Sequence, residues 1–224
     1  MSLEIRPTFL VSRTDAIGDV VLTLPVAGRL KQQFPGCWVV LIGRTYTAPV
    51  ATACPWVDDF LNLDDLLRKS ESAQVAVLRN YGAAAIIHVF PNKALAHLAQ
   101  KAKIPVRIGT RNRWQHWLTC NRLVALSRRH SLLHEAQLNL QLLQPLAVGS
   151  IISIAEVAEL VRLQPIEPLP PQFQQLLQQR EPGQLNIILH PRSRGSAREW
   201  GLDNYGQLAR LLHQAGYRVF VTGT

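Results

Sequence analysis

Short uninterrupted apolar runs alternate along the chain with longer segments in which apolar residues recur every three or four positions. Continuous apolar runs are typical of strands buried on both faces, whereas the longer spacing predicts amphipathic helices. The alternation therefore predicts an α/β protein whose parallel sheet is covered by helices on both faces. Strands are predicted at 8–12, 37–43, 58–63, 83–90, 106–109, 185–190 and 217–223, and helices at 18–34, 47–54, 72–82, 92–102, 131–146 and 202–216.

Individual residues refine the predicted helices. Pro25 should kink the first helix or begin a second one, because proline disrupts a helix interior. Gly82 and Gly216 are expected to end their helices, and Asp203 is a suitable N-cap for the last helix. The apolar face predicted for 131–146 consists of Leu132, Leu133, Ala136, Leu140 and Leu143.

The composition of the sequence changes between residues 148 and 183, where proline and glutamine are frequent. Prolines cannot lie inside a helix or a central strand, so this segment is predicted to be a linker carrying one short glutamine-rich helix. The prediction divides the chain into a complete Rossmann-like domain at 1–147, the linker at 148–183 and a partial domain at 184–224. The last segment contains one strand–helix–strand unit, too little to cover both faces of a sheet.

Composition places the chain among folded globular proteins, with 47% hydrophobic and 17% charged residues among 224. Lysine and arginine outnumber aspartate and glutamate by 24 to 15, which gives a net charge of +9. This excess favours an anionic partner such as a phosphorylated substrate, a membrane surface or a nucleic acid. A merely soluble basic surface fits the charge equally well.

Cys37, Cys54 and Cys120 lie far apart and form no CxxC pair, so neither a zinc site nor a disulfide framework is predicted. Residues 1–13 lack the pattern of a secretory signal, and no apolar run approaches the roughly 20 residues that a spanning helix needs. We therefore expect a cytoplasmic protein, with peripheral contact at the inner face of the membrane as a further expectation.

The turn after the first predicted strand raises the main chemical question, because it contains two aspartates and no lysine. Neither phosphate-loop glycine pattern occurs there, and a carboxylate would repel a phosphate. Asp19 lies where open α/β sheets bind ligands, so it is a candidate general base, with Gly18 allowing a sharp turn and leaving space beside it. The spacing also fits an ordinary charge at a helix N-terminus, and Asp15 fits a local Asx turn.

Several segments together resemble the ADP-heptose:lipopolysaccharide heptosyltransferases, which are glycosyltransferases of GT-B fold. The similar segments are "RTDAIGDVVLTLP" with the later "VDDFLNL", "IIHVFPNKALAHLAQKAKIPVRIG", "HEAQLNLQLL" and "LHPRSRGSAREWGLDNYGQLARLL". The resemblance covers essentially the whole chain. It implies two Rossmann-like domains, of which the first binds the acceptor sugar and the second binds the nucleotide sugar.

The resemblance also implies an inverting, metal-independent transfer in which Asp19 deprotonates the acceptor hydroxyl. No cofactor is expected, and the histidines show no metal-ligand spacing. The loop after 185–190 would bind the departing diphosphate through Arg192, Ser193, Arg194, Ser196 and Arg198, although it also fits a solvated basic turn. Where this chain has Arg198 the family usually has lysine, so the geometry there is expected to differ.

The expected partners are a nucleotide sugar and a phosphorylated lipopolysaccharide-core acceptor, with the arginines and tryptophans of 107–129 suited to an acidic glycan or a membrane surface. The same mixture resembles a platform for single-stranded nucleic acid, but no nucleic-acid-binding module is recognisable, so none is expected. The family continues beyond the strand at 217–223. Two alternatives therefore stay open, namely a shortened non-catalytic relative that binds glycan or protein and a basic nucleic-acid-associated protein.

Overall fold

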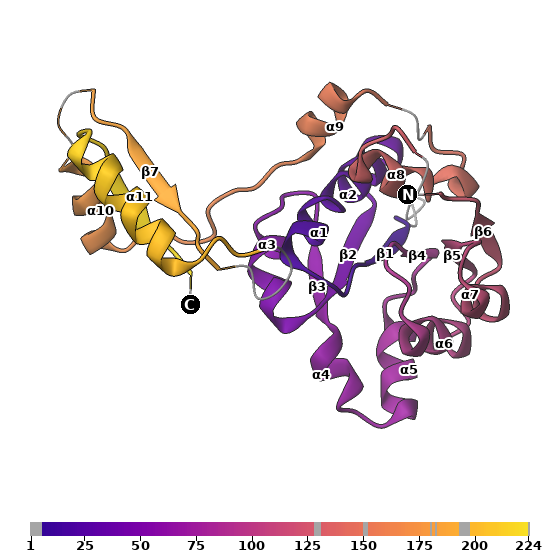
Figure 1. The fold of residues 1–224 in the computed structure, drawn as a ribbon. Coiled ribbons are helices and arrows are strands. Elements are labelled where there is room, and N and C mark those ends of the chain that lie inside the picture. Colours follow the sequence, from indigo (N-terminus) through magenta and orange to yellow (C-terminus); the bar gives the residue numbers. More distant parts are fainter. Residues whose placement is uncertain are drawn as a thin grey trace. The chain divides into compact units, whose positions relative to one another are not determined.

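The computed structural model describes residues 6–127, 131–149, 152–179, 181, 183–192 and 198–223. The chain forms two compact units, Met1–Ile166 and Glu167–Thr224. The division falls inside the segment 148–183 that the sequence predicted as a linker. Figure 1 labels the elements of both units.

The first unit is built on a six-stranded parallel sheet with strand order β3-β2-β1-β4-β5-β6. This is the order of a doubly wound Rossmann-like fold, in which the chain runs outward from β1 in one direction and then returns to continue in the other. The prediction of a parallel α/β sheet is confirmed. The strands are β1 (Thr8–Ser12), β2 (Trp38–Gly43), β3 (Asp59–Asn62), β4 (Ala85–His88), β5 (Val106–Thr110) and β6 (Arg122–Val124).

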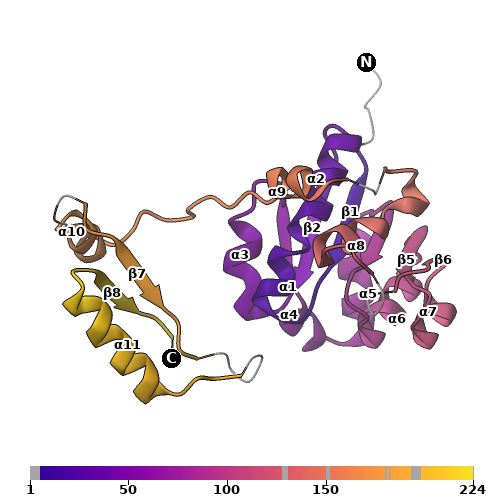
Figure 2. The same cartoon turned by 45° about the horizontal axis from the view of Figure 1, so that its top comes forward.

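Helices cover both faces of this sheet, as Figure 2 shows from a second direction. The helices of the unit are α1 (Ile17–Val21), α2 (Leu24–Gln33), α3 (Ala48–Thr52), α4 (Leu63–Leu67), α5 (Glu71–Asn80), α6 (Lys93–Lys101), α7 (Trp114–Thr119), α8 (Glu135–Gln141) and α9 (Ile154–Leu160). Alternate residues of β1 supply the two cores: Phe9 and Val11 pack with α2, α8 and α9, whereas Leu10 packs with α4, α5 and α6.

The segment predicted to be helical at 18–34 is two helices, which confirms the expectation that Pro25 begins a second one. Pro25 occupies the first turn of α2, where its missing N–H leaves no helical hydrogen bond unmade. The short α1 therefore stays separate, and it carries Asp19 in its first turn. Separation of the two helices allows α1 to follow the end of β1 while α2 packs along the sheet.

Four elements of the first unit were not predicted: α4, α7, β6 and α9. All four are short, with three to seven residues each, so their periodicity is hard to recognise. The predicted face of 131–146 is also partly wrong, since Leu132 lies before α8 and is fully exposed. Helix α9 contributes buried Val157 to the core of the first unit, so part of the expected linker belongs to that domain.

The second unit contains α10 (Pro171–Gln178), β7 (Asn186–Leu189), α11 (Leu202–Gln214) and β8 (Arg218–Val221). Its two strands are parallel and form the predicted strand–helix–strand unit. Among its described residues only Leu189 is buried, and Ile188 is 68% exposed. A single crossover helix therefore leaves most of the apolar surface uncovered. Gly201, rather than the predicted Asp203, occupies the N-cap position of α11.

Candidate functional site

Asp19 lies at the carboxyl edge of the first unit's sheet, in the helix that follows the central strand β1. Strand β4 lies beside β1 and begins the second half of the sheet. The strand order therefore reverses between β1 and β4. Ligands of open α/β sheets bind in the crevice at such a switch point. The fold thus places this carboxylate where a ligand would be expected.

A buried arginine holds the Asp19 carboxylate in place. The Nη2 of Arg13 lies 2.6 Å from Oδ1 of Asp19, and the Nε and Nη2 of the same guanidinium lie 2.6 and 2.9 Å from the two carboxylate oxygens of Asp15. Arg13 is only 4% exposed, whereas the Asp19 side chain is 35% exposed. The carboxylate is therefore oriented from the protein side and open to solvent on the other.

Arg13 also approaches a third carboxylate and an aromatic ring. Its Nη1 lies 3.7 Å from Oε1 of Glu135, and its guanidinium carbon lies 5.8 Å from the ring centre of Phe90. Burial raises the pKa of the Asp15 carboxyl above its ordinary value of 3.8, although Arg13 opposes the effect. The group is thus an arginine surrounded by carboxylates from β1–α1 and α8.

Asp15 has a structural position in this group, because both of its oxygens bind Arg13 and its backbone carbonyl accepts a hydrogen bond from the Tyr46 hydroxyl at 2.5 Å. Its side chain is also less exposed than that of Asp19. Of the two aspartates in the turn, Asp19 is therefore the better placed to meet a ligand. The assignment of Asp19 as a general base stays a prediction. Its neighbours do not enclose its side chain, so a ligand could reach the carboxylate.

The reasons given for Gly18 are only partly supported. Gly18 lies within α1 and has no positive φ, so no sharp turn requires a glycine there. A methyl group at its Cα would meet nothing within 4 Å, which agrees with open space beside Asp19. Its role in binding a substrate stays a prediction.

Arg13 was not predicted from the sequence. The signal was present, because an arginine that directly follows a buried strand must either leave the core or find carboxylates. Two aspartates within the next six residues supply that partner. Only the contacts show that one guanidinium binds both.

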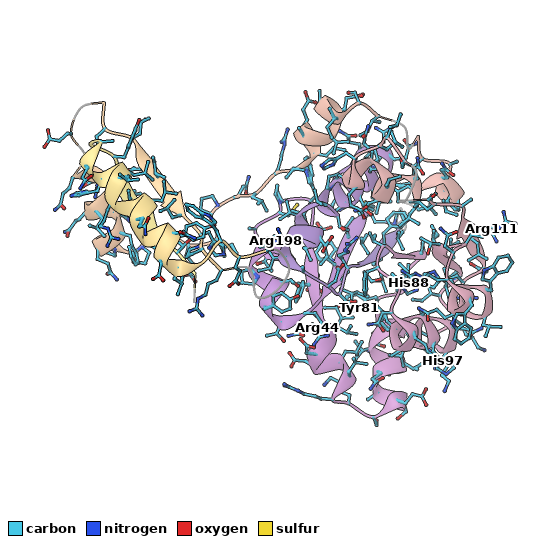
Figure 3. All side chains as sticks on the ribbon, in the orientation of Figure 1. Arg44, Tyr81, His88, His97, Arg111 and Arg198 are labelled. Atoms are coloured by element: carbon cyan, nitrogen blue, oxygen red, sulfur yellow. The ribbon has the colours of Figure 1, made fainter. Side chains whose placement is uncertain are left out.

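A second buried polar group lies at the same edge, immediately before Arg13. The Oγ of Ser12 is 3.2 Å from Nδ1 of His88, and the ring centres of His88 and His116 are 5.8 Å apart. Burial, aided by His116 and Arg107, lowers the pKa of His88 to about 3. His88 is thus a neutral core residue, and Figure 3 labels it.

The "R-I-G" segment has a structural explanation in β5. Arg107 donates to the backbone carbonyls of Thr119 and Ile104 at 2.8 and 2.6 Å. A side chain at Gly109 would come within 2.5 Å of Nδ1 of His116, so only glycine lets α7 pack this close to the strand. These two residues fix α7 against the sheet.

The predicted diphosphate residues belong to the second unit. Arg192 and Arg198 are exposed on either side of the loop, whereas Ser193, Arg194 and Ser196 lie outside the described residues. At the carboxyl ends of the two strands, His190 Nδ1 lies 3.0 Å from the Thr222 hydroxyl. This contact joins the segments after β7 and β8 and was not predicted from the sequence.

Within the described parts of the chain, no cluster of three or more histidine, cysteine or acidic residues has a geometry that could hold a metal ion. The three cysteines are buried and unpaired. No described helix has the length and apolar character needed to cross a bilayer.

No known protein-family model and no curated protein sequence matches this chain. Solved structures do match it. A glycosyl transferase family 9 structure from Veillonella parvula superimposes with a TM-score of 0.73 and 17% identity, over 100% of this chain and 64% of that one. The E. coli ADP-heptose LPS heptosyltransferase II superimposes with a TM-score of 0.67 and 16% identity, over 97% of this chain and 64% of that one.

The E. coli heptosyltransferase WaaC, solved with ADP-2-deoxy-2-fluoro heptose, matches with a TM-score of 0.66 and 16% identity, over 97% of this chain and 69% of that chain. This chain thus spans slightly less than two thirds of the first two structures. These matches agree with the resemblance noted in the sequence. The chain therefore has the α/β fold of the glycosyltransferase family 9 and heptosyltransferase structures, with a Rossmann-like N-terminal domain.

Proposed function

We propose that this chain belongs to an inverting glycosyltransferase that moves a heptose or related sugar from a nucleotide diphosphate to a phosphorylated, lipopolysaccharide-core-like acceptor. The first unit would bind the acceptor and the second would bind the nucleotide sugar. The observation that carries the proposal is the Asp19 carboxylate, which Arg13 holds at the switch point of the sheet with one side open to solvent. The fold shared with heptosyltransferase structures supports it.

Asp19 would act as the general base. Its carboxylate takes the proton of the acceptor hydroxyl while that oxygen forms a bond to the anomeric carbon of the donor sugar. The bond from the anomeric carbon to the diphosphate oxygen breaks, and its electron pair leaves with the diphosphate. Because attack comes from the face opposite the leaving group, the configuration inverts.

The departing diphosphate gains negative charge, which cationic side chains can stabilise. Arg192 and Arg198 are exposed and flank the loop after β7, so they are the described candidates for this contact. Ser193, Ser196 and Gly18 complete the proposed substrate-binding set on the strength of the resemblance. A metal would then not be needed, and we expect transfer to persist in the presence of a chelator.

Arg13 would be a positioning residue, since it touches the base rather than the substrate. In Arg13→Gln we expect kcat to fall about 10–100-fold with little change in KM, because small misplacements of a reacting group are costly. The free energy of unfolding should fall by only about 1–2 kcal/mol, because the carboxylates left behind are partly exposed. Steady-state kinetics and denaturant unfolding measure the two effects.

The matched variant Arg13→Lys keeps the positive charge and should recover part of kcat. If Arg13→Gln lost stability but kept kcat, Arg13 would only support the fold. If Arg13→Lys behaved like Arg13→Gln in both measurements, the two-carboxylate geometry of the guanidinium would be the essential feature.

The direct test titrates ADP-heptose and a phosphorylated core oligosaccharide against the chain and follows sugar transfer by mass spectrometry, with and without EDTA. Transfer with an inverted anomeric product is the expected result. Glycan binding without donor binding would favour a non-catalytic relative instead. Oligonucleotide affinity with a steep salt dependence and no sugar binding would favour the nucleic-acid alternative. We place the protein in the cytoplasm, where nucleotide sugars are made available.

A further inference from the structure

One face of α7 exposes large apolar side chains beside cations. Trp114, Trp117 and Leu118 are 66%, 56% and 68% exposed. Positions i, i+3 and i+4 share one side of a helix, whereas the opposite side of α7 buries His116 and Thr119. The exposed face and its cations, Lys93, Arg111 and Arg113, are called the tryptophan–arginine patch below.

The cations of the patch lie against its aromatic rings. The Lys93 ammonium is 5.7 Å from the Trp114 ring centre, and the Arg111 guanidinium carbon is 5.8 Å from that of Trp117. The indole N–H of Trp117 donates to the Arg111 carbonyl at 2.8 Å, which fixes this ring. Figure 3 shows Arg111 directed outward from the first unit.

The patch is positively charged without local compensation. Among the described residues, none of Lys93, Arg111 and Arg113 forms an ion pair with a carboxylate. By contrast Arg13, Lys31, Arg44, Arg68 and Lys101 all do. Uncompensated cations attract an anionic surface, and exposed apolar side chains among them favour one that also offers hydrocarbon.

Two cations of the patch, Lys93 and Arg111, lie along the same edge of the sheet as Asp19. Arg111 directly follows β5 and Lys93 begins the helix after β4, whereas Asp19 follows β1. The order β1-β4-β5 places the carboxyl ends of β1 and β5 two strands apart, about 10 Å. A surface that contacts Lys93 and Arg111 would therefore lie close to the candidate base.

We propose that the tryptophan–arginine patch docks the protein on an anionic lipid bilayer. Tryptophan rings settle at the boundary between headgroups and hydrocarbon, and lysine and arginine beside them bind anionic headgroups. Leu118 would be buried in the apolar layer of the bilayer. A nucleic acid or a free glycan has no such layer in which to bury this side chain. Docking would bring the sheet edge with Asp19 toward an acceptor anchored in the membrane.

The test measures sedimentation of the chain with phosphatidylcholine vesicles, with and without phosphatidylglycerol. We expect binding only to the anionic vesicles. Lys93→Gln/Arg111→Gln should weaken it about 25-fold, or about fivefold per charge removed. Trp114→Ala/Trp117→Ala should weaken it by about tenfold or more, because both rings lose their apolar contact.

Control variants make the same kinds of change elsewhere on the surface. Arg68→Gln/Lys69→Gln removes two exposed charges near α4, and Trp38→Ala removes a half-exposed tryptophan at the start of β2. Both should bind anionic vesicles within about twofold of the unchanged chain. Circular dichroism checks that each variant is folded.

Equal binding by the patch variants and the unchanged chain would overturn the proposal, as would equal binding to neutral and anionic vesicles. The proposal would also be overturned if the chain bound no vesicles but bound a single-stranded oligonucleotide, and if the patch variants lost that oligonucleotide affinity. Vesicle binding requires no sugar transfer, so failure of the proposed enzyme activity would leave this result interpretable by itself.

Discussion

Replacing Asp19 by asparagine is expected to lower the kcat for sugar transfer by about 10²–10⁴-fold, the usual contribution of a general base. Asparagine has nearly the same shape and can still accept a hydrogen bond from Arg13 through its oxygen, but it cannot take the proton of the acceptor hydroxyl. KM for both substrates should change little, because the change affects the transition state more than binding. Rates of nucleotide release and sugar transfer measure the loss.

The free energy of unfolding of Asp19 variants distinguishes a catalytic base from a charge that only stabilises the fold. The Asp19 side chain is 35% exposed, so Asp19→Asn and Asp19→Ala should each change the free energy of unfolding by no more than about 1 kcal/mol. Asp65→Asn, which alters an exposed aspartate of α4, is the matched control and should keep full activity. Loss of several kcal/mol in the Asp19 variants, with activity per folded molecule intact, would show that Asp19 only supports the fold.

Acidification is expected to destabilise the first unit through His88. The pKa of this histidine is about 3 in the folded chain because it is completely buried, against 6.5 for an exposed imidazole. Between these values the unfolded chain binds a proton that the folded chain does not, so stability is full above pH 6.5 and falls as the pH decreases toward 3. The loss attributable to His88 should reach about 2–3 kcal/mol by pH 4.5.

Denaturant unfolding between pH 7.5 and 4.5 measures this loss. His88→Gln removes the titrating group, so its stability should depend less on pH than that of the unchanged chain, even if it starts from a lower value. His97→Gln, which changes an exposed histidine, is the matched control. Parallel curves for His88→Gln and the unchanged chain would show that His88 does not cause the acid effect. His116, whose pKa burial also lowers, would then be the next group to replace.

The first predicted strand shows why so much of this fold can be derived from sequence. Phe9, Leu10 and Val11 form a continuous apolar run, and the structure buries all three on the two faces of one strand. Strands of this kind must be covered on both sides, so helices have to lie between them in the chain. The short α7 and β6 lacked any such signal, because elements of three to six residues show too little periodicity.

The site was only half predictable for a related reason. Asp19 could be selected because its position after a buried strand near a glycine is a feature of the sequence. The contact of Arg13 with both aspartates depends on the angle between β1 and α1, which residue types do not specify. The arginines and tryptophans of the patch were noticed in the sequence, whereas Lys93 and Leu118 were not. Their shared surface required knowledge that α7 is a helix with His116 turned inward.

The sequence by itself determined the parallel α/β class, the change of texture near residue 148 and Asp19 as the candidate base, because these follow from apolar patterning, proline content and residue chemistry. Only the tertiary structure decided that Arg13 orients Asp19, that His88 is buried beside Ser12 and His116, and that α9 packs with the first unit. The physical reason is that patterning fixes which surfaces must be buried, whereas the partners of a polar side chain depend on elements that meet only after the sheet has assembled.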